Sequence, residues 1–172
     1  MPMPYVVPQT TADRNKGFTV FNSGSTDHRG LVVRTTCDLE NELARLLFAH
    51  FRRLNSRITW ERASKELFSE TGLLSSLAKM TKIALYLALI TDEEARDLRL
   101  LGRLRNMYAH GQHRDQFNRD AETAKIVMDL TLRKNSATTF AGFEVEWIYL
   151  GCTAHLRALL EQRASVEAAS AA

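Results

Sequence analysis

Apolar residues recur every three or four positions along most of the chain, which is the pattern of helices with one face in a core. The clearest stripe consists of Val32, Thr36, Leu39, Leu43, Leu46, Leu47, Phe51 and Leu54. Asp27, a residue type that caps helix N-termini, stands just before this stripe. The pattern therefore predicts a first long helix that begins near Asp27.

Two more helices are predicted in the next stretch of the chain. The second runs over about 59–69 and is ended by Gly72, and the third runs over about 74–90. Because the third is apolar on nearly all sides after Lys82, we expect it to be the central, buried helix.

The stretch Thr91-Asp92-Glu93-Glu94 has the spacing of a capping box, in which the first and fourth side chains satisfy each other's backbone amides. It predicts the start of a fourth helix, which runs to His110 and has Gly111 at its left-handed C-cap. A fifth helix is predicted over about 115–134.

Two patterns overlap in the last part of the chain. An alternation of apolar and polar residues begins at Phe143 and continues through Tyr149, whereas apolar residues at helical spacing run from Phe140 to Ala158. Since no turn residues bracket a hairpin there, we predict a sixth helix over about 138–164. The fold class expected is all-α, with five or six helices in one compact domain.

Proline usage separates the beginning of the 172-residue chain from the rest, because all three prolines lie within the first eight residues. Proline breaks helix interiors, so the long proline-free remainder supports a helical body. We expect an irregular N-terminal arm over 1–26, a helical domain over 27–165 and a frayed tail over 166–172.

Charge and composition narrow the class of protein. The formal net charge of +3 is far from the strong basicity of an obvious nucleic-acid binder. Cys37 and Cys152 are isolated, as in reduced cytoplasmic proteins. The longest apolar run, Ile83 to Ile90, is too short to cross a bilayer, and we see no signal peptide. We expect a cytoplasmic protein without membrane contact.

Motifs for cofactors and metals are missing from the sequence. It has no phosphate-binding glycine loop, dinucleotide fingerprint or nucleophile elbow. His110 and His113 have a spacing that can chelate a metal, but Gly111 lies between them and no third ligand follows. We therefore expect neither a cofactor nor a metal.

Arginines gather in two stretches of the chain and offer candidates for a binding patch. The candidates are Arg45, Arg52, Arg53, Arg99 and Arg103. Such clusters bind phosphate groups or acidic partners, although a solvated helix surface has the same composition.

The segment over 103–110, RLRNMYAH, places Arg, Asn and His at the end of the fourth predicted helix. At about 100° per residue, Asn106 and His110 lie about 40° apart, on one face. Arg105 lies about 140° from His110, so these two residues cannot meet across one regular helix.

Together, LFSETGLL at 67–74, LYLALI at 85–90 and RLRNMYAH at 103–110 resemble the mannitol operon repressor (MltR) family. In that family an LF…GPL stretch precedes an apolar helix that ends in LGLI, and an IRKIRNxFAH-type signature follows. Leu73 and Ala88 stand here in place of the family's proline and glycine.

The resemblance, which covers about 27–163, implies an all-α fold and regulation of genes for sugar-alcohol uptake. It implies no DNA-reading element, and the sequence shows no helix-turn-helix with a polar second helix. We therefore expect a transcriptional regulator that acts through protein contacts, forms a homodimer and has a DNA-binding regulator protein as a candidate partner.

The same segment also resembles the R-x4-H signature of HEPN-type nucleases and their inactive, toxin-type relatives, which leaves an alternative open. That resemblance implies metal-independent cleavage of RNA across a dimer interface. Arg105 would hold the phosphate, His110 would transfer protons and Asn106 would orient one of them. Against this, an arginine and a histidine near a helix C-terminus also stabilise the helix dipole without any catalysis.

Overall fold

The computed structural model describes residues 27–110, 117, 119–131 and 144–170, and within these ranges it contains six helices and no strand. The helices are α1 (His28–Leu54), α2 (Trp60–Glu66), α3 (Leu77–Tyr86), α4 (Asp92–His110), α5 (Ala121–Met128) and α7 (Val145–Ala169). The prediction of an all-α fold is confirmed. The expected arm at 1–26 lies outside the described residues.

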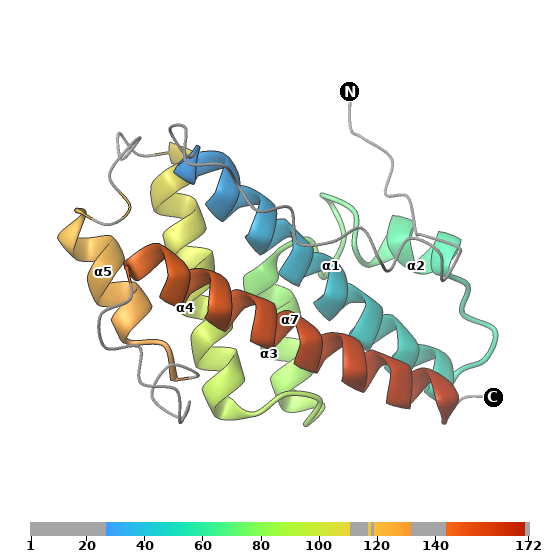
Figure 1. Ribbon diagram of the computed structural model, residues 1–172. Helices are drawn as coiled ribbons and strands as arrows, with labels where there is room; N and C mark the ends of the chain where they lie inside the picture. Colours follow the sequence, from blue (N-terminus) through green and yellow to red (C-terminus); the bar gives the residue numbers. More distant parts are fainter. Residues whose placement is uncertain (1–26, 111–116, 118, 132–143, 171–172) are drawn as a thin grey trace.

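The two longest helices, α1 and α7, lie side by side along most of their length (Figure 1). On its other side α1 packs against α3 and α4, and α5 contacts both α4 and α7. Side chains from all five of these helices fill the core, among them Leu39, Leu43, Leu47, Met80, Leu98, Leu101, Leu104, Val127, Tyr149 and Leu156. Each such side chain stabilises the fold by roughly 1.5–3 kcal/mol when it leaves water.

Helix starts follow the capping signals in the sequence. The Asp27 carboxylate accepts a hydrogen bond from the Gly30 amide at 2.9 Å, which confirms the predicted start of α1. The Thr91 amide donates to Glu94 at 2.8 Å and the Glu94 amide donates to the Thr91 hydroxyl at 3.2 Å, so the capping box of α4 is confirmed. The Glu94 carboxylate also binds both Nη atoms of Arg163, which ties α7 to the start of α4.

The third helix differs from the prediction in length and position. It ends at Tyr86 because Ala88 adopts a φ of 55° and the Leu89 amide turns back to the Ala84 carbonyl at 2.9 Å. The helix buries only one face, and Tyr86 is 74% exposed. The expectation that this helix is central and buried was wrong; α1 is the helix that contacts α3, α4 and α7.

The family-like stretch at 67–74 forms a tight turn between α2 and α3. The Leu74 amide donates to the Leu67 carbonyl at 2.7 Å, which closes the turn. A Cβ atom on Gly72 would lie 2.3 Å from that same carbonyl oxygen, so only glycine fits there. Leu73, at the position of the family's proline, is 77% exposed.

The first residues of the last two predicted helices, 115–116 and 138–143, lie outside the described residues. The prediction that the fifth starts near residue 115 was wrong, because Asp120 caps α5 by accepting the Thr123 amide at 2.9 Å. The described part of the 138–164 stretch is a helix, as predicted, and not the alternative strand. This helix, α7, begins at Val145 and continues to Ala169. None of the described helices is long and apolar enough to cross a membrane.

Candidate functional site

One face of α4 carries exposed polar residues from the RLRNMYAH segment and from the preceding turns of the helix. Its members are Arg96, Arg99, Arg103, Asn106 and His110, all exposed, and we call this surface the α4 face. They follow one another at intervals of three or four residues, which places them within about 80° around the helix. The α4 face thus runs along the helix for about 21 Å.

The α4 face is basic because no exposed carboxylate of α4 lies beyond its first turn. Asp97 is the one acidic residue after that turn, and it is buried, where it accepts the Thr131 amide at 2.8 Å. Arg103 forms an ion pair with Glu122 of α5 at 2.6 Å. Within the described part of the chain, no carboxylate pairs with Arg96 or Arg99, so their guanidinium groups remain available to a partner.

Arg105, the arginine of the R-x4-H motif, belongs to a different side of α4. Its Nη1 donates to the Glu40 carboxylate of α1 at 3.2 Å, and the same Glu40 oxygen accepts the Leu77 amide of α3 at 3.3 Å. Glu40 therefore links α1, α3 and α4. Burial, with Glu40 nearby, raises the pKa of the Cys37 thiol beside this junction, which keeps the sulfur protonated and unreactive.

The C-terminal end of α4 is fixed to α1 by an arginine that the sequence did not single out. Arg29 donates from Nη2 to the Ala109 carbonyl at 3.0 Å, where a positive charge also stabilises the helix dipole. His110 and Asn106 stay exposed on the α4 face. No hydrogen bond or ion pair among the described residues joins Arg105 to either of them.

The second group of candidate arginines lies in the second half of α1, and one of them, Arg53, links α1 to α7. Arg53 binds Glu167 of α7 at 2.9 Å, and His50 binds the same carboxylate at 3.0 Å. Arg45 pairs with Glu42 at 3.4 Å. Arg52, by contrast, is exposed in the last turn of the helix. The structure thus separates the five candidates into two surfaces on different helices.

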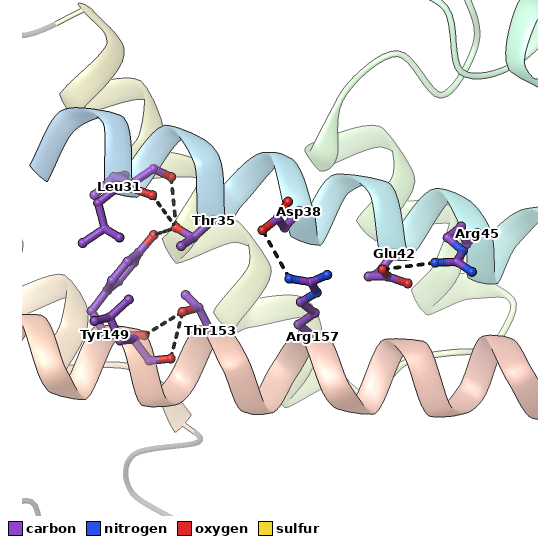
Figure 2. A network of polar contacts seen from close by, with 10 residues as sticks. Leu31, Thr35, Asp38, Glu42, Arg45, Tyr149, Thr153 and Arg157 are labelled. Carbon is purple, nitrogen blue, oxygen red and sulfur yellow. Dashed lines mark hydrogen bonds and ion pairs between the residues drawn. The ribbon is translucent and has the colours of Figure 1, made fainter. Parts of the chain in front are cut away.

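A polar seam between α1 and α7 was missed by the sequence analysis (Figure 2). The Tyr149 hydroxyl bonds to Thr35, and burial raises the pKa of Tyr149 to about 12. Farther along, Arg157 binds Asp38 at 3.3 Å. Because these partners are more than a hundred residues apart in sequence, no local pattern predicts them.

Glu42 is a buried carboxyl group in this seam whose hydrogen bonding is incomplete among the described residues. It is only 5% exposed, and among the described residues its Oε2 has no hydrogen-bond partner. Burial raises the pKa of this carboxyl, although the Arg45 and Arg157 guanidinium groups act in the opposite direction. The seam is buried at Tyr149, where it contributes to the packing of α1 on α7, and it is open to solvent at the Arg157–Asp38 pair.

Candidate metal ligands lie apart from one another in the part of the chain that the structure describes. Among the described residues, no group of three or more His, Cys, Asp or Glu side chains is placed to hold an ion. His113, half of the histidine pair seen in the sequence, lies outside the described residues.

Together, the described helices define an all-α domain in which one face of α4 carries three exposed arginines. No protein-family model matches the chain, and no curated protein matches it. A solved structure does match it: the X-ray structure of the MtlR-HPr complex from Escherichia coli, with a TM-score of 0.54 and 16% sequence identity. The match covers 83% of this chain and 91% of that chain. The chain thus shares its fold with MtlR, as the resemblance to mannitol operon repressors implies.

Proposed function

We propose that this protein is a regulator that acts by binding another protein, and that the α4 face is the contact surface. The observation that carries this proposal is the pair Arg96 and Arg99, exposed on adjacent turns without a carboxylate partner in the described residues. Arginine is enriched at protein interfaces, where its planar guanidinium binds carboxylates through two hydrogen bonds. A partner with an acidic surface fits the α4 face.

The fold supports a protein partner over a nucleic acid. The structurally similar MtlR was solved in complex with HPr, which makes an HPr-type protein the first partner to test. Autonomous DNA binding is disfavoured by a net charge of only +3. Under this proposal the protein influences transcription, in the manner expected of mannitol operon repressors, through the protein that it binds.

Isothermal titration calorimetry tests the class of partner. Full-length protein is titrated with HPr, with a short DNA duplex and with a short single-stranded RNA at physiological salt. We expect saturable heat with HPr and, for the nucleic acids, weak binding that disappears as salt rises. Saturable, salt-resistant binding of DNA or RNA together with no heat from HPr contradicts the proposal.

A further inference from the structure

Two carboxylates in the polar seam between α1 and α7 lie near one arginine. Asp38 and Glu42 are four residues apart on α1, so they lie about 6 Å apart along the helix and on one side of it. Figure 2 shows the Arg157 guanidinium of α7 between them, with its Nη1 on the Asp38 carboxylate at 3.3 Å. The long arginine side chain has several rotamers, so Arg157 can reach either carboxylate.

The two carboxylates differ in how much they gain from this arginine. The Asp38 side chain is 41% exposed, so water solvates its charge when no guanidinium is near. The Glu42 side chain is almost fully buried, and within the described part of the chain its Oε2 has no hydrogen-bond partner. Its Oε1 accepts one long hydrogen bond, from Arg45 at 3.4 Å. Because a buried charge without full hydrogen bonding is far more costly than an exposed one, an ionised Glu42 gains more from Arg157 than Asp38 does.

We propose that Arg157 leaves Asp38 and binds Glu42 when Glu42 loses its proton, so that the contact between α1 and α7 changes with pH. While Glu42 is protonated, it is neutral and Arg157 binds Asp38, as in this structure. When Glu42 ionises, its proton passes to water, the guanidinium binds the buried carboxylate and Asp38 is left to the solvent. The Arg157 side chain is itself half exposed, so this movement does not unpack the core.

The surroundings of Glu42 act on its proton in two directions. Burial, which has the largest effect, raises the pKa of the Glu42 carboxyl, and the nearby Glu161 of α7 acts in the same direction. Arg45 on α1 and Arg157 on α7 lower it. Helices α3 and α4 pack on the other side of α1, away from this seam. Because burial prevails, we expect Glu42 to lose its proton, and Arg157 to move, above the ordinary carboxyl value of 4.5.

Nuclear magnetic resonance on the full chain tests the movement of Arg157. The carboxyl carbon of Glu42 and the Nε of Arg157 are followed from about pH 4 to about pH 8. We expect both signals to change with one shared midpoint above pH 4.5. In Glu42→Gln the Arg157 signal should stay constant above pH 4.5, whereas the matched control Glu70→Gln, at an exposed residue outside the helices, keeps the change. A constant Arg157 signal in the wild type, or a change that persists in Glu42→Gln, overturns the proposal.

A second measurement on the wild type decides the question even if Glu42→Gln fails to fold. Nuclear Overhauser contacts of the Arg157 side-chain protons identify the carboxylate that the guanidinium binds. As pH rises through the midpoint, we expect the contacts to the Asp38 Hβ protons to weaken and those to the Glu42 Hγ protons to strengthen. Contacts that stay with Asp38 at every pH overturn the proposal. The α4 face takes no part in this exchange, so the binding of HPr is a separate readout.

Discussion

Arg105 donates from Nη1 to the Glu40 carboxylate across 3.2 Å, which turns the arginine of the R-x4-H motif toward α1. His110, five residues later, is exposed on the α4 face. The two residues therefore have different environments although the sequence places them in one motif. The contact with Glu40 gives Arg105 a structural role, and the exposed arginines of α4 become the groups available to a partner.

Removal of this ion pair is expected to destabilise the junction of α1, α3 and α4. The side chains of Arg105 and Glu40 are 35% and 13% exposed, so solvent screens the pair only in part. We expect Arg105→Ala to lower the free energy of unfolding by about 1–2 kcal/mol in urea titrations. In a double-mutant cycle with Glu40→Ala, the coupling energy should be about 0.5–1 kcal/mol. A cycle with no coupling shows that the contact contributes nothing to stability.

The nuclease alternative has a direct test in RNA cleavage. Purified protein is incubated with total RNA in the presence of a metal chelator. The Arg105 guanidinium is hydrogen-bonded to Glu40 and is therefore not free to bind a phosphate group. We expect no cleavage above that of a His110→Ala preparation. Cleavage that disappears in both His110→Ala and Arg105→Ala instead supports a HEPN-like site.

The end of α3 offers a stabilising substitution. Ala88 adopts a φ of 55°, which strains any residue with a Cβ atom, and the mannitol repressor family has glycine there. Ala88→Gly is expected to raise the free energy of unfolding by about 0.5–1 kcal/mol. Ala78→Gly, inside the same helix, should lower it by a similar amount, about 0.5–1 kcal/mol. Destabilisation by both substitutions, measured by urea unfolding, contradicts the strain at Ala88.

The buried carboxyl of Glu42 predicts a dependence of stability on pH. Burial raises its pKa in the folded protein above the ordinary value of 4.5. The folded state therefore favours the neutral form, so the stability that this group contributes is present below pH 4.5 and is lost as pH rises through the folded value. Glu42→Gln should raise the free energy of unfolding at pH 7, and the gain should shrink as pH falls toward 4.5.

Thermal unfolding over this pH range measures that difference. Glu70→Gln, at an exposed residue outside the helices, is the control and should follow the wild type throughout. Lower stability of Glu42→Gln at neutral pH shows that Arg45 and Arg157 outweigh the burial of the carboxylate.

Local capping signals in the sequence predicted the starts of α1 and α4. Asp27 and the pair Thr91 and Glu94 act through contacts only three residues apart, so their roles follow from sequence spacing alone. The end of α3 was not predicted, because continuous apolar residues from Ile83 to Ile90 concealed the turn at Ala88.

The sequence predicts only part of how the polar residues of α4 are arranged. Helical periodicity correctly separates Arg105 from the face that contains Asn106 and His110. The pairing of Arg105 with Glu40 joins residues 65 positions apart and depends on how α4 packs on α1. Arg96 was missed as a candidate, because the sequence does not show that its side chain is exposed on the α4 face.

The most direct test of the account is the affinity of HPr for charge-reversal variants, measured by calorimetry. The account predicts that Arg96→Glu combined with Arg99→Glu abolishes binding without changing the thermal midpoint. Arg52→Glu combined with Arg57→Glu, on the surface near the end of α1, should retain wild-type affinity. Wild-type binding by the α4 variant, or equal losses in both variants, contradicts the α4 face as the partner-binding surface.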